Sequence, residues 1–314
     1  MTSEVQITII IPVYNRAEVV KTTLDSVANQ SYRPIDVVLV DNNSSDNTLE
    51  VLNEWKQAVE ADDFIVKVLS ESKPGATAAR NRGLKEVTTP YTIFFDSDDV
   101  MAPHHVKRAV DAFNENPHLD IVGWNTNVKT LSGNKSQYRF CDKDILYNHI
   151  FHATMATQRF AARTQLFREV GEWNEMLPAW NDYELGVRLL IANPKIKKLT
   201  GEATVTVILQ EKSITGTGFS SRPHEWESAL DAIDLILDNS EYRSMKKYID
   251  VRRVILAGHY HREGAIDEAQ RLLTEVLSRC GWYRKLIMKL FYFIISRGGR
   301  GIALLARPLL CFTK

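Results

Sequence analysis

The sequence predicts an α/β protein in which a mostly parallel sheet lies between helices and a helical extension follows. Two observations predict it. Short β-branched runs alternate with amphipathic helical windows through roughly the first hundred residues, and residues 224–280 carry only helical patterns. Alternating strands and helices form a parallel sheet covered on both faces, with the ligand crevice at the carboxyl ends of the strands.

Strands rich in Ile and Val and helices with apolar residues at helical spacing are expected in the first part of the chain. The expected strands are ITIIIPV (7–13), IDVVLV (35–40), FIVKVLSE (64–71) and YTIFF (91–95), and the expected helices cover 16–30, 44–59 and 75–87. Ser44 or Ser45 is expected to cap the second of these helices.

The remaining elements are less regular. The expected elements are a helix over Pro103–Asn114, a strand over 121–128, a helical window over 142–170, a helix over Asp182–Ile191 and a strand over 203–209. Residues 257–277 fit either a helix pair of tetratricopeptide type or a helical cap on the main domain, since a single copy does not establish a repeat.

The bulk composition excludes several classes of protein. The 39 basic and 39 acidic residues give a formal net charge of zero. The first domain has no basic patch that would indicate nucleic-acid binding. The three cysteines share no metal-type spacing, which favours a reducing compartment over a disulfide scaffold or a zinc site. No G-x-G-x-x-G follows the first strand and no P-loop is present, which excludes a nicotinamide dehydrogenase and a P-loop enzyme.

Polar residues follow all four early strands, which predicts one site at a shared sheet edge. They are Asn15, the run 41–43, residues 71–73 and the run 96–99. Asp96, Asp98 and Asp99 repel one another unless a cation or a fixed network neutralises them. Such oxygen ligands suit Mg²⁺ or Mn²⁺, with phosphate oxygens completing the shell. The alternative is an acidic, solvated turn that caps the helix at Pro103.

Other residues on this edge are typical of a nucleoside diphosphate site. Lys73, Arg80 and Arg82 surround a Gly-bearing turn, where guanidinium and backbone N–H groups can meet phosphate oxygens. Tyr14 and Asn15 offer an aromatic face and an amide at the first strand end, and Asp41 and Asn42 offer hydrogen bonds to a base at the second. Each of these motifs alone also fits ordinary turn chemistry.

Four ordered motifs resemble those of the family 2 glycosyltransferases, which are inverting enzymes of the GT-A fold. They are ITIIIPVYNRAEVVKTTLDSVANQSY, VVLVDNNSSDNT, GATAARNRGL and FFDSDDV. The resemblance is close over residues 5–105 and looser to about residue 220. It implies a GT-A nucleotide-sugar and acceptor-binding catalytic domain over 1–222, a helical extension over 223–280 and a basic amphipathic tail over 281–314.

The resemblance also implies roles for single residues. One group of them would bind the donor: Pro12, Tyr14 and Asn15 along the nucleoside, Asp41 and Asn42 at the base, Lys73 and Arg80 at the diphosphate, and Asp96 and Ser97 in the D-x-D. Asp98, Asp96 and Asp99 are the expected ligands of Mn²⁺ or Mg²⁺. Asn42 departs from the usual Asp-Asp pair, but an amide still accepts from uracil N3–H, so a UDP-sugar stays the favoured donor.

Inverting transfer needs a general base that takes the proton of the acceptor hydroxyl. The segment LPAWNDYELGVRLL resembles the Glu-Asp motif of the family, with Asn181 in place of Glu and Asp182 aligned to the base. Glu184 is the reserve candidate, and a plain helix cap is the alternative role for Asp182. Trp180 is expected either to stack on a sugar or to pack in the core.

A second departure from the family pattern lies downstream. Where relatives often carry a His for the metal or diphosphate, this chain has Gln210, followed by Lys212. Because Gln is a weaker ligand, the metal would depend on the D-x-D carboxylates, phosphate oxygens and water. Lys212 is the alternative source of positive charge for the phosphates.

The C-terminal tail alternates basic and apolar residues. From Gly281 it carries seven basic residues and no acid, which favours contact with anionic headgroups at a membrane interface. The alternative is a helix packed on the protein's own body. Its longest apolar stretch, Leu286–Ile295, is too short to span a bilayer. We therefore expect a cytoplasmic protein, peripheral on the inner face of the plasma membrane.

These observations predict a hexosyltransferase of class EC 2.4. It would move a sugar from a nucleotide-sugar to a glycan or lipid-linked saccharide in cell-surface polysaccharide synthesis. One alternative is a non-catalytic sugar-binding protein of the same fold. Another is a phosphatase of the haloacid-dehalogenase type, which FFDSDDVMAP also fits, although three strands precede the motif here.

Overall fold

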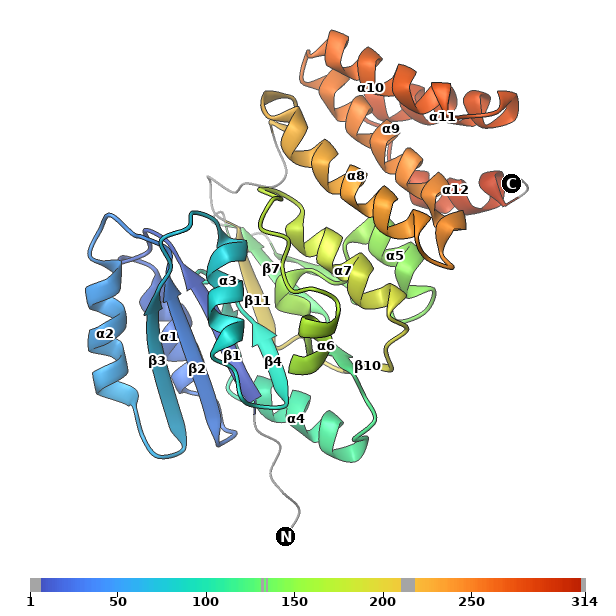
Figure 1. Cartoon of the computed structure of the whole chain (residues 1–314). Coiled ribbons are helices and arrows are strands. Elements are labelled where there is room, and N and C mark those ends of the chain that lie inside the picture. Colours follow the sequence, from blue (N-terminus) through green and yellow to red (C-terminus); the bar gives the residue numbers. More distant parts are fainter. Residues whose placement is uncertain (1–6, 131–132, 134, 210–217, 312–314) are drawn as a thin grey trace. The chain divides into compact units, whose positions relative to one another are not determined.

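The computed structural model describes residues 7–130, 133, 135–209 and 218–311 (Figure 1). The chain forms two compact units, each discontinuous in sequence. The first unit comprises Met1–Ile145, Thr154–Met176 and Ala192–Lys212, and the second comprises Leu146–Ala153, Leu177–Ile191 and Ser213–Lys314.

A mostly parallel seven-stranded sheet forms the centre of the first unit. Its strand order is β10-β6-β9-β4-β1-β2-β3, and β9 is antiparallel to both of its neighbours. The predicted α/β class is therefore confirmed. The strands are β1 (Ile7–Val13), β2 (Ile35–Asp41), β3 (Phe64–Ser70), β4 (Tyr91–Phe94), β6 (Ile121–Gly123), β9 (Phe160–Arg163) and β10 (Ile196–Lys198).

The strand register brings the polar strand ends together. Val13 of β1 pairs with Asp41 of β2, and Asp41 pairs with Ser70 of β3. On the other side of β1, the backbone N–H of Phe95 donates to the carbonyl of Ile10. Because these four strands are parallel, the residues that follow them share one edge of the sheet.

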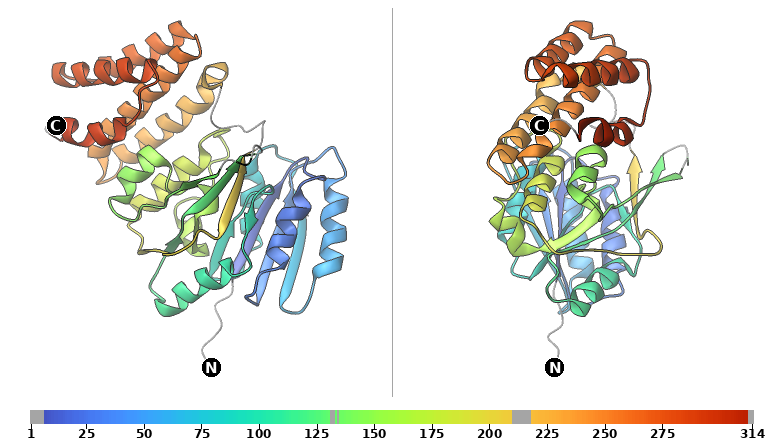
Figure 2. Two further views of the ribbon diagram at one scale, coloured as in Figure 1. Left: turned by 180° about the vertical axis from the view of Figure 1, so that it is seen from behind. Right: turned by 90° about the vertical axis from the view of Figure 1, so that its right-hand side faces the viewer.

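Helices cover both faces of this sheet. One face packs its Ile and Val side chains against helices α1 (Val20–Ala28), α2 (Thr48–Val59) and α4 (His105–Glu115). Figure 2 shows α1 and α2, in blue, from the side opposite to Figure 1. The other face carries α3 (Ala76–Lys85) and α6 (Thr164–Glu169), where Phe94 meets Phe167 at a centroid distance of 5.0 Å. The sheet is thus buried on both sides, as parallel sheets are.

A second, four-stranded sheet completes the first unit. Its order is β5-β11-β7-β8, and β11 runs antiparallel to β5 and parallel to β7. The strands are β5 (Val100–Met101), β7 (Thr126–Thr130), β8 (Lys135–Tyr138) and β11 (Val205–Leu209). Residues 96–99 form the acidic loop. Since β5 directly follows them, this sheet fixes the C-terminal end of the acidic loop.

The helical window expected over residues 142–170 is wrong as a single helix. It contains α5 (Ile145–His152), the short 3-10 helix η1 (Thr157–Arg159), β9 and α6. Phe160, Ala161 and Ala162 are buried in the middle of the sheet. Continuous burial removes the alternation that marks an exposed strand, so a short apolar strand looks like part of a helix.

The second unit is helical within its described residues, in agreement with the expected extension. Helix α9 contacts several of the other helices and forms an antiparallel pair with α10. Besides α5, the described helices of the second unit are α7 (Asn181–Ile191), η2 (Phe219–Ser221), α8 (Pro223–Asp238), η3 (Arg243–Met245), α9 (Lys246–Arg262), α10 (Ile266–Ser278), α11 (Trp282–Ser296) and α12 (Ile302–Leu310).

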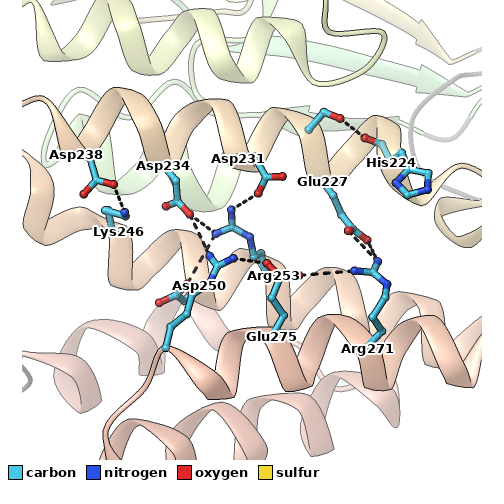
Figure 3. Close-up of polar contacts among 12 residues, drawn as sticks. His224, Glu227, Asp231, Asp234, Asp238, Lys246, Asp250, Arg253, Arg271 and Glu275 are labelled. Carbon is cyan, nitrogen blue, oxygen red and sulfur yellow. Dashed lines mark hydrogen bonds and ion pairs between the residues drawn. The ribbon is translucent and has the colours of Figure 1, made fainter.

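A buried ion network joins the helices of the second unit (Figure 3). Arg253 of α9 is only 1% exposed, and its guanidinium lies 2.7 Å from Asp231 and 2.7 Å from Asp234 of α8. Arg284 of α11 binds Asp250 of α9 at 2.7 Å. Burial raises the pKa of Asp250, and the charges of Arg284 and Arg253 oppose this shift. Because each buried charge has a partner, removing one of them would leave another uncompensated.

We predict that Gly83→Ala destabilises the first unit. Gly83 lies in α3 where the helix crosses the sheet, and a Cβ atom there would lie 2.6 Å from Cγ2 of Ile10 and 3.2 Å from Cγ2 of Val40. The overlap should cost about 1–3 kcal/mol of unfolding free energy, although Ala favours a helix more than Gly does. Urea unfolding measures this. Lys85→Ala on the exposed side of α3 is the control, and an equal effect of both variants would contradict the prediction.

We predict that His105 makes the first unit less stable in acid. The ring is fully buried, its Nδ1 lies 2.7 Å from Oγ1 of Thr204, and burial lowers its pKa to about 3. Below pH 6.5 the unfolded chain therefore binds a proton that the folded chain does not, so the unfolding free energy falls as the pH decreases. The loss from this group should reach about 2 kcal/mol at pH 5.

The variant His105→Gln tests this pH dependence, since an amide can keep the bond to Thr204 but does not titrate. The difference in stability between the variant and the parent should shrink steadily from pH 7 to pH 5. A difference that stays constant over this range would show that His105 is not the group responsible.

Candidate functional site

The loop after β1 presents an exposed aromatic ring. Tyr14 is 56% exposed, and Asn15 follows it with a φ of 49°. The backbone N–H of Asn15 donates to Oγ of Ser44, and the N–H of Ser45 donates to Oδ1 of Asn15. Ser44 and Ser45 thus bind this loop, and the expectation that one of them caps α2 is wrong. Residue Asn47 holds the N-cap position, without a side-chain cap bond.

Asp41 leaves a buried oxygen without a partner at the carboxyl end of β2. The side chain is 4% exposed, and its Oδ2 accepts from the N–H of Ser44 at 3.3 Å. Its Oδ1 is buried and has no hydrogen-bond partner in the described part of the chain. A buried, unpaired acceptor is costly, so a hydrogen-bond donor that reached this oxygen would stabilise it.

Asn42 holds the loop between β3 and α3. Its Nδ2 donates to the carbonyls of Glu71 at 3.0 Å and Lys73 at 2.7 Å, and its Oδ1 accepts from the N–H of Gly75 at 2.7 Å. Only an amide can both donate and accept in this way, since a carboxylate would face two carbonyl oxygens. The departure from the Asp-Asp pair therefore has a structural reason, and the predicted contact of Asn42 with a base is still a prediction.

Asp96 is held from two sides. Its Oδ1 accepts from Nη2 of Arg80 at 2.8 Å, and its Oδ2 accepts from Nε2 of Gln158 in η1. Arg80 is 6% exposed, and its guanidinium lies 4.4 Å from the ring centroid of Trp173. A cation that is stacked on an aromatic ring and paired with a carboxylate is fixed in position.

Asp98 is the carboxylate of the D-x-D whose only ion pair with the described residues is a long one. Its side chain is 23% exposed, and Oδ2 lies 3.8 Å from Nη2 of Arg16. Burial and then the negative charge of Asp96 raise the pKa of Asp98, while Arg16 opposes the shift. The carboxylate form of Asp98 is therefore short of positive charge, which a bound cation would supply.

Asp99 points toward the second sheet. Its Oδ1 accepts from the backbone N–H of Ile208 in β11 at 3.0 Å, and the residue is 1% exposed. Burial and then the charge of Asp96 raise the pKa of Asp99 to about 8. A carboxyl group that is largely protonated at neutral pH is a poor metal ligand. Ser97, which lies between Asp96 and Asp98 in the sequence, is also buried.

The acidic loop fits a divalent metal only if a ligand completes the coordination. Within the described ranges, no three His, Cys, Asp or Glu side chains converge on a point that could hold a metal ion. Asp96 and Asp98 are both partly exposed, but Arg80 and Gln158 already bind the two oxygens of Asp96, and Asp99 is buried, so Asp98 is the carboxylate best placed to bind a cation. This agrees with the chemistry of Mg²⁺ and Mn²⁺, which are often held by one or two carboxylates plus phosphate oxygens.

Lys73 and Pro12 lie near the same edge of the sheet. The Nζ of Lys73 lies 2.5 Å from Oε2 of Glu175, whose Oε1 accepts from Asn81 at 2.8 Å. These two bonds lower the pKa of Glu175. Pro12 is buried in β1 and pairs with Val40. Lys73 is thus an exposed cation already tied to an acid, and Pro12 shapes the strand end.

The predicted base lies in the second unit, at the start of α7. The Oδ1 of Asp182 accepts from the backbone N–H of Tyr183 at 2.8 Å. Glu184, the reserve candidate, is 2% exposed, and both of its oxygens bind Arg188 at 2.8 Å. Glu184 is therefore committed to a buried ion pair. The roles of both acids in catalysis are still predictions.

Trp180 lies directly before α7 in an unusual backbone conformation. Its φ is 51°, a region that a bulky residue adopts only when its surroundings impose it. Its ring packs against Trp226 at 5.3 Å, and the guanidinium of Arg252 lies 5.3 Å from the ring centroid. A shallow pocket with a volume of about 50 Å³ opens here, lined by Trp180, Phe219, Arg252, Ile255, Leu256 and His259.

Some predicted residues lie outside the described part of the chain, and some important ones were missed. Gln210 and Lys212 fall in the first group. The sequence analysis missed Gln158, Trp173 and Glu175, which hold Asp96, Arg80 and Lys73. These three come from residues 154–176, far along the chain from their partners, and no local pattern signals such contacts.

A family model and several curated relatives match the chain. The model described as Glycosyl transferase family 2 matches residues 8–169, about half of the chain. An uncharacterized glycosyltransferase of Haemophilus influenzae is 31% identical over 141 residues, which are 45% of this chain and 55% of that protein. A poly(ribitol-phosphate) beta-glucosyltransferase of Bacillus spizizenii is 30% identical over 142 residues, 45% of this chain and 22% of that protein. The chain thus spans about half of these relatives or less.

Solved structures of similar fold cover more of the chain. S. aureus TarS 1-349 in complex with UDP-GlcNAc has a TM-score of 0.67 and 19% identity, covering 93% of this chain and 90% of that one. The mannosyltransferase PcManGT from Pyrobaculum calidifontis, in complex with GDP-Man and Mn²⁺, has a TM-score of 0.58 and 16% identity, covering 98% and 87%. At this identity the likeness is one of fold, and it confirms the predicted GT-A class.

We predict that Asn42→Asp destabilises the first unit and loosens the loop after β3. The variant keeps an acceptor for the N–H of Gly75 but turns a carboxylate toward the carbonyls of Glu71 and Lys73. The loss should be about 1–3 kcal/mol of unfolding free energy. Denaturant unfolding measures the loss, and faster amide exchange at Gly75 should accompany it. Asn53→Asp on exposed α2 should change little, and equal effects at both positions would refute this role of Asn42.

Proposed function

Because the chain belongs to glycosyl transferase family 2, we propose that it transfers a sugar from a nucleotide-sugar donor to a saccharide hydroxyl with inversion. The observation that carries the proposal is the arrangement of Asp96, Asp98 and Arg80 at one sheet edge. Asp96 is fixed by Arg80 and Gln158, and Asp98 is left partly exposed beside it. A guanidinium and an open carboxylate side by side suit a diphosphate with its cation.

The nucleoside would bind at the ends of β1 and β2. The unpartnered Oδ1 of Asp41 suits a donor N–H group on the base, and the exposed ring of Tyr14 suits stacking. TarS, which shares the fold, has been solved with UDP and with UDP-GlcNAc. We therefore propose a UDP-sugar as the donor, with Pro12, Asn15 and Asn42 shaping the pocket wall.

Asp98 would hold a divalent metal. When bound, Mn²⁺ or Mg²⁺ supplies positive charge to the leaving diphosphate. Arg80, stacked on Trp173 and paired with Asp96, keeps the neighbouring charge in place during the reaction. The partial exposure of Asp98 and the negative charge of Asp96 beside it support this assignment. Ser97 and Asp96 would meet the ribose or the diphosphate.

Asp182 is our proposed general base. It would accept the proton of the acceptor hydroxyl while that oxygen attacks the anomeric carbon and the diphosphate leaves from the opposite face. Glu184 is the weaker candidate because Arg188 holds both of its oxygens. The strained Trp180 and the pocket beside it, with Arg252 and His259, would contact the acceptor saccharide.

A donor panel and two variants test the proposal. Among UDP-, GDP-, CDP- and dTDP-sugars, a UDP-sugar should raise the melting temperature most, and Mn²⁺ should enhance the effect. Asp98→Asn should remove the enhancement by Mn²⁺. Asp182→Asn should slow donor hydrolysis or transfer by about a hundredfold or more while the shift caused by UDP persists. The exposed Asp111→Asn on α4 is the control for all three measurements.

The other candidate functions give different results. A phosphatase would release inorganic phosphate from a phosphoester without any sugar acceptor, and a non-catalytic relative would bind the donor without hydrolysing it. Binding of UDP that is unaffected by Asp98→Asn and independent of Mn²⁺ would overturn the proposed metal site. Full turnover in Asp182→Asn would overturn the proposed base.

A further inference from the structure

Helix α11 has two apolar faces, and only one of them is buried by the described residues. Ile287, Met288, Phe291 and Ile295 are buried. The contact with α9 is close, because a Cβ added at Gly258 would lie 2.3 Å from Cγ2 of Ile295. One apolar face is therefore enough to hold α11 in the second unit, and the other needs a separate explanation.

The unused face is a continuous apolar stripe. Its members are spaced four, four and three residues apart, which places them on one side of a helix. They are Trp282, Leu286, Leu290 and Phe293, with 76%, 58%, 47% and 53% of their surface exposed. We call these four residues the outer stripe. Single exposed apolar residues are normal, but a row of four along one helix marks an interaction site.

Basic residues flank the outer stripe. Lys285 and Lys289 are exposed and make no ion pair with the described residues, and Arg297 stacks on Phe293 at 3.7 Å. No acidic residue follows Gly281 in the sequence. A twofold dimer through this face would place basic residues on both sides of the interface without acidic residues of α11 to pair with them, which is unfavourable. An anionic surface, in contrast, would match both the apolar stripe and its basic borders.

We propose that the outer stripe docks the protein onto an anionic lipid bilayer, with α11 lying in the interface. An apolar face with Trp and Phe, bordered by Lys and Arg, is typical of helices that lie in the headgroup region. None of the helices in the described ranges is long and apolar enough to cross a membrane. With 15 residues, α11 is roughly 22 Å long, which suits an orientation along the surface.

Vesicle sedimentation tests the docking. The protein should bind vesicles of phosphatidylcholine with about 30% phosphatidylglycerol at least tenfold more tightly than pure phosphatidylcholine vesicles, and about 0.5 M salt should weaken the binding. Leu286→Ser with Leu290→Ser should reduce binding at least tenfold. Lys285→Gln with Lys289→Gln should reduce it similarly, since each basic residue contributes about fivefold.

Matched variants separate this surface from a general effect. Leu235→Ser with Ile266→Ser removes two exposed apolar side chains elsewhere in the second unit and should leave binding unchanged. Binding should also shift the tryptophan emission to shorter wavelength, and Trp282→Phe should abolish most of that shift. All of these positions are exposed, so the melting temperature should stay the same.

Three results would overturn the proposal. One is equal binding to both kinds of vesicle, and another is undiminished binding by the serine variant of the outer stripe. The third is a dimer in solution that the same serine variant converts to a monomer, without vesicle binding by either protein. None of these results depends on turnover, so they leave the proposed transferase activity to its own test.

Discussion

The candidate site at the sheet edge depends on how Asp96 is held. Arg80 and Gln158 donate hydrogen bonds to its two oxygens, and the guanidinium of Arg80 lies over the ring of Trp173. The negative charge of this carboxylate lies next to Asp98 and Asp99, and after burial it is the second cause of the raised pKa of both. The charge of Asp96 thus favours either protonation or cation binding at its two neighbours. Asp99 is buried, which favours the protonated form, and Asp98 is partly exposed, which allows a cation to bind.

The early strands could be predicted from sequence because each is a short β-branched run next to an amphipathic helix. This holds for β1, β2, β3 and β4, whose bounds agree with the predicted runs to within a residue. The prediction failed in the middle of the chain, where β9 has only four residues and its first three are buried. Such a strand is specified by its neighbours in the sheet, and its own sequence carries little periodic signal.

The site shows the same division between local and distant information. That Asp41 and Asp98 lie at one edge could be predicted because the ends of parallel strands share an edge, and Arg80 was predicted from the Gly-bearing turn before α3. The contacts that hold Asp96 and Lys73 could not be predicted, since Gln158 lies 62 residues from Asp96 and Glu175 lies 102 residues from Lys73. Asn42 is instructive because the sequence suggested a base contact, whereas its amide is used to hold a loop.

The one-sided charge of the C-terminal segment has a consequence for how the molecule would approach a surface. Of 39 basic and 39 acidic residues, seven basic and no acidic ones lie from Gly281 onward, which leaves 32 basic against 39 acidic and a formal charge of −7 elsewhere. A negatively charged surface would therefore attract one end of the chain and repel the rest. Electrostatic attraction would draw the C-terminal segment toward such a surface before any apolar contact forms.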